Sequence, residues 1–341
     1  PYPTSLVLST KFHNQATPDM YLVPYPSPAA IADRTPVELG CCGSRRPRFE
    51  PVVMLLAVQQ RAADLRTKGF TVVAQPVFAD QAVLTQAAED CAARLKSNLE
   101  EVSELGLNPR KQGWSFNEIC HRSHYRYDFQ HLHTPAIEMI TDAVLKTVEP
   151  ILLQLHSLPV HPDERGGTLL RQLWPRRFSP CRPEPLMTGS IVSRPGASTQ
   201  PFHRDAEAKT LVRSALFPSH RLFNCFVPLV DIEEGATGTE FWPGSHHTRA
   251  WRQWVDAPDD SVRMRLFQQA TTEAPACPAG GMILFDFRTM HRGLPNTDTR
   301  DRPYLYTVCG TGWATDNSNF PARSLSSFVS SRSAPCGTSQ S

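Results

Sequence analysis

The sequence predicts a mainly β protein, with a strand-rich core in its second half and helices from its first half packed on that core. Two observations carry this prediction. Strand-like segments bounded by Gly, Pro or Asn turns follow one another between residues 186 and 308. Three side chains that can bind a metal ion, His203, Asp205 and His291, lie among these segments.

The first half contains helical patterns. Residues 50–66 form a helix candidate. Over residues 80–95, apolar side chains recur at three- and four-residue steps, and Asp80 stands at the N-cap position. A further pattern covers residues 136–149, where Pro150 is expected to end the helix. Each of these helices is expected to pack one face on the strands.

Short runs rich in β-branched and aromatic residues are typical of strands. Residues 69–74 form one such run between two helix candidates. The runs of the second half span residues 186–196, 221–231, 239–246, 280–287 and 302–308.

These elements predict one domain over residues 49–321, made of a helical part at 49–157 and a strand core at about 186–312. Residues 1–48 and the Ser-rich residues 322–341 are expected to be weakly ordered or to wrap around the surface.

Composition narrows the classes of function. The 341 residues carry a net charge of +2 with interspersed signs, which disfavours nucleic acid as a partner. No run of eighteen apolar residues predicts a membrane span. The nine cysteines include no C-x-x-C pair, so we expect buried thiols in a reducing compartment, the cytoplasm. The sequence begins with Pro1 rather than Met, which leaves room for a removed targeting peptide.

The candidate metal ligands have a chemical logic. Alternate side chains of a strand point to one face, so His203 and Asp205 can reach the same ion. His291, 86 residues after Asp205, would supply a second imidazole. Two imidazoles and one carboxylate hold ferrous iron on one face of its octahedron in non-haem oxygenases. Taken alone, an H-x-D tripeptide is common and more often belongs to a solvated loop.

At these residues the sequence resembles the phytanoyl-CoA dioxygenase-like (PhyH) family of iron(II)- and 2-oxoglutarate-dependent oxygenases. The similarity covers roughly residues 186–312, about a third of the chain. It rests on Gln200-x-x-His203-x-Asp205, on Gly235-Ala236-Thr237 followed by Pro243-Gly244-Ser245-His246, and on His291-x-Gly293-x-x-Asn296 followed by Arg302.

The resemblance implies a double-stranded β-helix, or jelly-roll, whose mouth holds Fe(2+). It assigns the metal to His203, Asp205 and His291, and the cosubstrate 2-oxoglutarate to Arg302. A guanidinium suits this role because it can bind a carboxylate through two parallel hydrogen bonds. Arg300 is the alternative anchor two residues earlier. Gln200 would donate its amide to the cosubstrate or orient a metal ligand, with a polar loop residue as the competing interpretation.

The predicted function is therefore an iron(II)- and 2-oxoglutarate-dependent dioxygenase. It would use O2 to oxidise, most simply to hydroxylate, a small organic molecule and would release succinate and CO2. Related halogenases have a small residue in place of the carboxylate, so Asp205 favours oxygenation. Two alternatives stay open: a metal-dependent enzyme on the same barrel that uses no 2-oxoglutarate, and an inactive barrel that binds a ligand.

Substrate contacts are predicted from two places. One is an aromatic and basic segment before the core, which would line the pocket mouth or pack on the barrel as a loop. It contains Trp114, Phe116, Tyr125, Arg126, Tyr127 and Phe129. The other is the pair Phe241 and Trp242 before a Pro-Gly turn. Aromatic walls and the lack of a cationic cluster for a pyrophosphate favour a secondary metabolite over an acyl-CoA.

The remaining histidines are expected to be structural or to lie at the rim of the site, because none has a convincing third ligand nearby. They include the pairs His121 and His124, His131 and His133, and His246 and His247.

Overall fold

The computed structural model describes residues 50–110, 114–130, 133–158, 182–206, 221–235, 237–247, 253, 259–312, 314 and 319–325. All of them lie in one unit, Arg48–Ser341, whereas Pro1–Pro47 form another. The predictions for residues 1–48, for most of the tail 322–341 and for His131 fall outside the described residues. Within these ranges no helix has the length and apolarity needed to cross a membrane.

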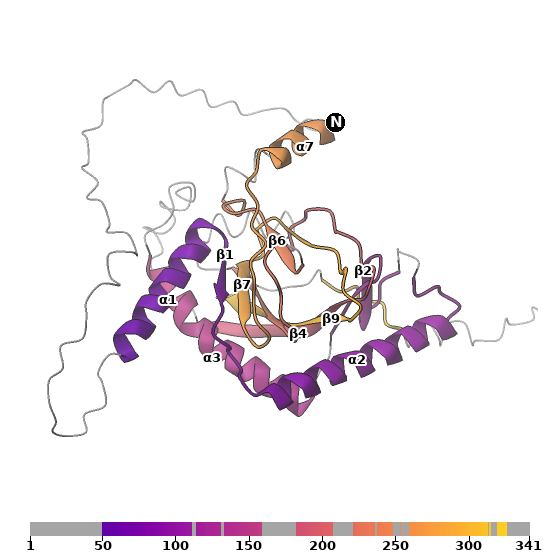
Figure 1. Ribbon diagram of the computed structural model, residues 1–341. Coiled ribbons are helices and arrows are strands. Elements are labelled where there is room, and N and C mark those ends of the chain that lie inside the picture. Colours follow the sequence, from indigo (N-terminus) through magenta and orange to yellow (C-terminus); the bar gives the residue numbers. More distant parts are fainter. Residues whose placement is uncertain are drawn as a thin grey trace, which may run out of the picture. The chain divides into compact units, whose positions relative to one another are not determined.

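Two antiparallel sheets organise the described part of the chain (Figure 1). The large sheet has the order β1-β7-β5-β9-β4-β3-β2. Its strands are β1 (Phe70–Val73), β2 (Ile119–Ser123), β3 (Arg126–Gln130), β4 (Pro183–Ser193), β5 (Leu222–Pro228), β7 (Met282–Asp286) and β9 (Arg302–Thr311). The small sheet pairs β6 (Thr239–Phe241) with β8 (His291–Gly293). Isolated backbone bridges add His203 beside β8 and Glu273 beside β6. The predicted mainly β, jelly-roll class is confirmed.

Alternating side chains give the large sheet two apolar faces, because successive residues of a strand point to opposite sides. In β5, Phe223 and Cys225 belong to one core, and Leu222 and Phe226 belong to the other. The first core also contains residues of the helices, and the second contains Phe241 of the small sheet. The large sheet is therefore covered on both sides, by helices on one and by the small sheet on the other.

Helices α1 (Glu50–Thr67), α2 (Gln81–Glu104) and α3 (Pro135–Ser157) lie together on one side of the large sheet (Figure 1). The cap of α2 is the predicted one: Asp80 Oδ1 accepts hydrogen bonds from the backbone N–H groups of Ala82 (3.0 Å) and Val83 (3.4 Å). The predicted helices at 50–66, 80–95 and 136–149 are confirmed, although the last two are longer than expected. A short helix, α7 (Asp260–Gln268), was not predicted.

Helix α3 continues through Pro150, so the prediction that this proline ends the helix is wrong. An internal proline costs about 3 kcal/mol because it removes a hydrogen bond and crowds the preceding turn. Beyond it, however, Ile151, Leu152 and Leu155 are buried in the helix-covered core. Burial of each such side chain contributes about 1.5–3 kcal/mol. Their combined burial outweighs the cost of the proline.

The segment expected to be a pocket mouth or a loop is instead the β2–β3 hairpin, which extends the large sheet. β3 pairs with β4 from Arg126↔Ser193 to Gln130↔Gly189. The aromatic side chains of this segment pack in the helix-covered core rather than around a substrate: they are Trp114, Phe116, Tyr127 and Phe129.

Strand β1, predicted at residues 69–74, lies at the edge of the large sheet and pairs with β7. Gly69, just before it, has φ +88°, a left-handed conformation that favours glycine. Its carbonyl oxygen accepts hydrogen bonds from Asp286 N (2.9 Å) and Thr289 Oγ1 (3.0 Å). A residue of the first half of the chain, Gly69, thus stabilises the loop that leads to His291.

Candidate metal centre

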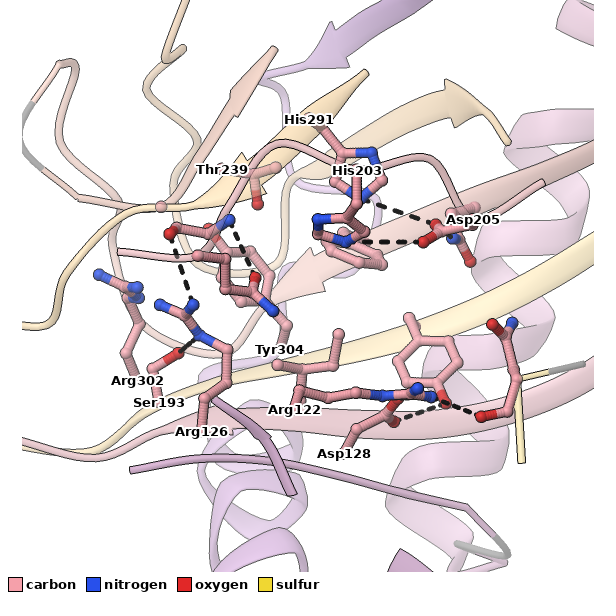
Figure 2. Close-up of a pocket in the computed structure, with 18 of the residues that line it drawn as sticks. Arg122, Arg126, Asp128, Ser193, His203, Asp205, Thr239, His291, Arg302 and Tyr304 are labelled. Atoms are coloured by element: carbon pink, nitrogen blue, oxygen red, sulfur yellow. Dashed lines mark hydrogen bonds and ion pairs between the residues drawn. The ribbon is translucent and has the colours of Figure 1, made fainter. Parts of the chain in front are cut away.

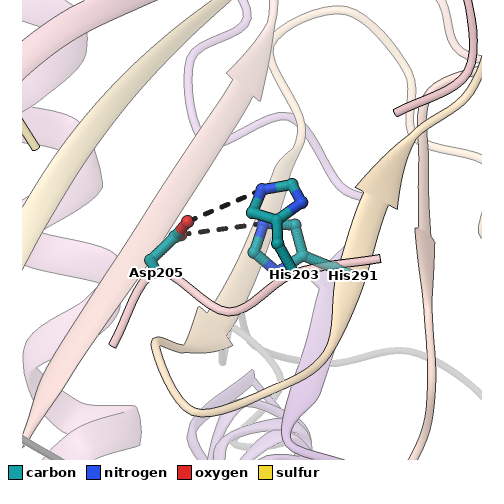
Figure 3. Close-up of side chains that lie close together, drawn as sticks. All are labelled: His203, Asp205 and His291. Carbon is teal, nitrogen blue, oxygen red and sulfur yellow. Dashed lines mark ion pairs between the residues drawn. The ribbon is translucent and has the colours of Figure 1, made fainter. Parts of the chain in front are cut away.

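His203, Asp205 and His291 lie on the wall of one pocket (Figure 2) and converge on one point (Figure 3). Their ligand atoms all lie within 4.8 Å of one another. Asp205 Oδ1 is 3.8 Å from His203 Nε2, and Asp205 Oδ2 is 3.7 Å from His291 Nε2. Bonds of about 2 Å at right angles separate neighbouring ligands by about 3 Å, so movements below about 1 Å would bring these atoms onto one ion.

The backbone fixes the two histidines to each other. His203 N donates to His291 O and His291 N donates to His203 O, both at 2.9 Å. This antiparallel pair joins the segment around His203 to β8 and places the two ring centroids 4.5 Å apart. The positions of both imidazoles are therefore set by sheet pairing, although the residues are far apart in the sequence.

Backbone carbonyls determine which ring nitrogen of each histidine is free. Nδ1 of His203 lies 3.0 Å from Pro201 O, and Nδ1 of His291 lies 3.0 Å from Thr289 O. A carbonyl can only accept, so the proton is on Nδ1 and the lone pair of Nε2 is exposed to Asp205. Burial, and then the neighbouring His291, lower the pKa of His203 to about 4. Neutral imidazoles with one carboxylate fit a divalent transition metal such as iron(II).

The pocket beside these residues has a volume of about 300 Å³. Four arginines line it, Arg122, Arg126, Arg204 and Arg302 (Figure 2 labels all but Arg204). They come from β2, from β3, from the loop containing His203 and from β9. The sequence did not reveal this group of arginines, because it forms only when these distant segments come together in the fold. The expectation that no cationic cluster suits a pyrophosphate stays a prediction.

Arg302 opens β9 and its side chain lies in the pocket, only 5 % exposed. Nη1 donates to Pro295 O (3.0 Å) and Nη2 to Leu294 O (2.9 Å), whereas the buried Nε has no partner among the described residues. A buried donor without a partner on a pocket wall calls for an explanation, such as a bound ion, water or ligand. A carboxylate of 2-oxoglutarate fits there.

Arg300, the alternative anchor, does not lie in the pocket. Its side chain is 81 % exposed and pairs with Asp298 over 3.4 Å. Of these two arginines, Arg302 is thus the one that lines the pocket of the candidate metal ligands.

Gln200 lines the pocket, and its role is partly defined by its contacts. Gln200 Oε1 accepts a hydrogen bond from Gly293 N (3.0 Å), and Gln200 N donates to Gly293 O (3.0 Å). These bonds hold β8 just after His291. The side-chain amide nitrogen of Gln200 remains as the group that can donate to a cosubstrate. The predicted contact between Gln200 and the cosubstrate therefore stays a prediction.

A polar network around the buried Asp128, which the sequence analysis missed, lines the pocket (Figure 2). Arg122 Nε donates to Asp128 Oδ2 (2.8 Å), and the Tyr306 hydroxyl donates to Asp128 Oδ1 (2.8 Å). Burial raises the pKa of Asp128, although the adjacent Arg122 opposes this. A signal was present: in Arg126-Tyr-Asp128-Phe-Gln130 polar and aromatic residues alternate, as in a strand with one polar and one apolar face.

Two predicted substrate contacts are not supported by the structure. Phe241 is fully buried and stacks on Phe70 with ring centroids 4.5 Å apart, in the core between the sheets. Trp242 follows it, and neither residue belongs to the pocket wall. Arg126, the third predicted contact, does line the pocket.

The other described histidines support the structural interpretation. His121 stacks on Trp114 and on Tyr127, with centroid distances of 5.3 and 5.1 Å. His246 is buried with Nε2 3.1 Å from Arg66 O. Among the described residues, His203, Asp205 and His291 form the one group of three or more potential ligands.

Among protein families, the model described as phytanoyl-CoA dioxygenase (PhyH) matches residues 65–304, which is most of the chain. Solved structures are similar at low identity. AviO1 from Streptomyces viridochromogenes Tue57 has 16% identity and a TM-score of 0.45 over 75% of this chain and 96% of its own.

Two further structures are similar to the same extent. The non-heme alpha ketoglutarate dependent carbocyclase SnoK from nogalamycin biosynthesis has 15% identity and a TM-score of 0.44, over 74% of this chain and 83% of its own. EctD from S. alaskensis, solved with 2-oxoglutarate and 5-hydroxyectoine, has 14% identity and a TM-score of 0.43, over 74% and 75%. Likeness at this level does not transfer an activity or a substrate.

Proposed function

The chain belongs to the phytanoyl-CoA dioxygenase family of iron(II)- and 2-oxoglutarate-dependent oxygenases, and from this premise we propose that it hydroxylates a small organic molecule, with release of succinate and CO2. The observation that carries the proposal is the arrangement of two free Nε2 atoms and the Asp205 carboxylate around one point on the pocket wall. An arginine with an unpartnered buried Nε lines the same pocket.

In this proposal His203, Asp205 and His291 bind one face of the metal ion. When bound, ferrous iron and 2-oxoglutarate supply the oxidation of a C–H bond by O2, coupled to decarboxylation of the keto acid. Arg302 binds the carboxylate at the far end of 2-oxoglutarate and so orients the keto-acid end toward the ligands. Asp205 occupies the position that a halide would need, which favours hydroxylation.

The rest of the pocket wall supports a substrate with hydrogen-bond acceptors. Arg122, Arg204 and Asn224 offer donors, whereas Ile191 and Phe226 offer apolar contact. A molecule with both oxygen atoms and a hydrocarbon part would match these groups. The aromatic residues of this wall are Phe226, Tyr304 and Tyr306 rather than those expected from the sequence. That the substrate is a secondary metabolite remains a prediction.

The decisive experiment uses the purified chain without oxygen. Iron(II) and then 2-oxoglutarate are added while the weak visible charge-transfer band of the iron–keto acid chelate is followed. We expect a band that needs both additions and saturates at a 1:1 ratio. The Asp205→Ala variant should give no band under the same conditions.

Oxygen consumption and succinate release are then measured with a library of small oxygenated metabolites. A compound that stimulates both identifies the substrate class. Metal binding without any effect of 2-oxoglutarate would contradict the proposal and support a metal-dependent enzyme of another kind. If no metal binds either, the binding-protein alternative is supported instead.

A further inference from the structure

A second buried arginine lies next to Arg302 on the same face of the large sheet. Arg126 of β3 pairs with Ser193 of β4, and Ser193 in turn pairs with Arg302 of β9. Directly paired residues point to the same side, and neighbouring strands are about 4.8 Å apart, so the two arginine Cα atoms are about 10 Å apart. Both side chains line the pocket (Figure 2).

The two guanidinium groups meet at one atom. Arg126 Nη2 donates to Leu294 O over 2.6 Å, and Arg302 Nη2 donates to the same oxygen over 2.9 Å. Arg126 Nε also donates to Ser193 Oγ (2.8 Å), the residue between the two arginines in the sheet. The heads of both side chains are therefore held close together.

Neither cation has an anionic partner in the part of the chain that the structure describes. Every hydrogen bond of Arg126 and Arg302 goes to a neutral hydroxyl or carbonyl oxygen. Arg126 is 2 % exposed and Arg302 is 5 % exposed. Two buried like charges repel each other and lose hydration, a cost that an anion between them would offset.

The electrostatic effect is visible at Arg126. Burial, and then the neighbouring Arg302, lower the pKa of Arg126 to about 10. The group still carries its charge at neutral pH. The pair is thus a doubly positive patch inside the pocket that the candidate metal ligands also line.

Gly293 makes room for this arrangement. It lies two residues after His291, and a Cβ atom at this position would be 2.6 Å from Arg126 Cζ and 2.7 Å from Arg126 Nη1. The same Cβ would be 2.7 Å from Gln200 Oε1, and contacts below 3.0 Å force a shift, so any other residue at 293 would displace the guanidinium, the Gln200 amide or both. The glycine therefore lets Arg126 approach the ligand strand β8.

We infer that Arg126 is a second cosubstrate-binding residue, which grips the distal carboxylate of 2-oxoglutarate together with Arg302. This inference rests on the proposed function and adds to it. The sequence analysis assigned Arg126 to the substrate; its position beside Arg302 favours the cosubstrate, because a single carboxylate can accept from both guanidinium groups.

The test measures binding of two keto acids to the iron(II)-loaded protein without oxygen. 2-Oxobutyrate is 2-oxoglutarate without the distal carboxylate, and both form the same chelate at the metal. In Arg126→Gln we expect the dissociation constant of 2-oxoglutarate to rise at least about tenfold, the effect of losing one charge-assisted hydrogen bond. That of 2-oxobutyrate should stay within about twofold. Arg300→Gln, an exposed arginine of the same region, serves as the matched control and should change neither constant.

Two outcomes would overturn the inference: unchanged 2-oxoglutarate binding in Arg126→Gln, or equal weakening for both keto acids, which would indicate a purely structural arginine. Lack of 2-oxoglutarate binding by the unmodified protein would instead contradict the proposed function itself. If Arg126→Gln does not fold, Arg126→Lys replaces it, because lysine keeps the charge but lacks the planar pair of donors that matches a carboxylate. It should weaken binding of 2-oxoglutarate and leave that of 2-oxobutyrate within about twofold.

Discussion

Asn224 donates a hydrogen bond from Nδ2 to Asp205 Oδ2 over 2.7 Å. The same oxygen lies 3.7 Å from His291 Nε2. Asn224 belongs to β5 in the middle of the large sheet, so the carboxylate is attached to the most buried part of the fold. The orientation of a ligand oxygen is thus set by a residue that cannot itself move freely.

This contact predicts that Asn224→Leu weakens metal binding while the fold is retained. Groups that orient metal ligands typically account for 10–100-fold in affinity, so we expect a loss of about that size. Competition between the protein and a chelator for iron(II) or cobalt(II) measures it. Unchanged affinity would show that Asp205 needs no support from the sheet.

Removal of a ligand should have a larger effect than removal of its support. In Asp205→Ala we expect metal affinity to fall by more than about 100-fold, beyond the range of the supporting residue. The same chelator competition measures the change. Asp298→Ala, which removes an exposed carboxylate, is the control and should bind metal as the unmodified protein does. Equal affinity in both variants would remove Asp205 from the metal site.

The low pKa of the buried His246 predicts how the free energy of unfolding depends on pH. Burial, and then the adjacent His247, lower the pKa of His246 to about 3, whereas a histidine in the unfolded chain has its usual pKa near 6.5. Between these values only the unfolded chain binds the proton, so the folded state loses stability as the pH falls below about 6.5. The loss attributable to His246 should be about 1–2 kcal/mol between pH 7 and pH 5.

The comparison is between the unmodified protein and His246→Gln, which does not titrate but retains a donor toward Arg66 O. Urea unfolding at pH 7 and pH 5 gives the free energy of unfolding of each. The variant should lose less stability over this interval. Parallel losses would mean that the pKa of His246 is the same in the folded and the unfolded chain.

The position of Pro150 inside α3 predicts that its replacement by alanine stabilises the protein. Its side chain is exposed and it lies inside α3, where it removes one helical hydrogen bond. Pro150→Ala restores the N–H group, so we expect the free energy of unfolding to increase by about 1–3 kcal/mol. Urea unfolding at pH 7 measures this. A decrease would show that the helix has adapted its packing to the proline.

The sequence predicted local features well, because these depend on short-range patterns. It also singled out the three side chains that the structure brings together, whose role as metal ligands stays a prediction. Asp80 capped a helix as expected, and the alternation of His203 and Asp205 placed both on one face. Pro150 was misjudged because its cost is local, whereas the burial that outweighs it comes from contacts with distant strands. A local signal decides an element only where tertiary packing does not oppose it.

The pocket could not be predicted in the same way. Arg126 and Arg302 meet through two strand pairings whose register no local pattern reveals. Phe241 was placed near the substrate because it precedes a turn, yet the stacking partner that holds it in the core, Phe70, lies in the first half of the chain. The alternation in residues 126–130 did carry the needed information, since it marks a strand with a polar face.

The contacts of Gly69 have a practical consequence for anyone who wishes to shorten or transplant this site. All three ligands and Arg302 are encoded downstream of residue 182, so a truncated gene would still contain them. Such a fragment would nevertheless lack the edge strand that ties down residues 286–289, and it would also lose Arg126. The candidate ligand residues therefore cannot be transferred to another protein by themselves. A variant that shortens or transplants the site needs to keep the upstream strands.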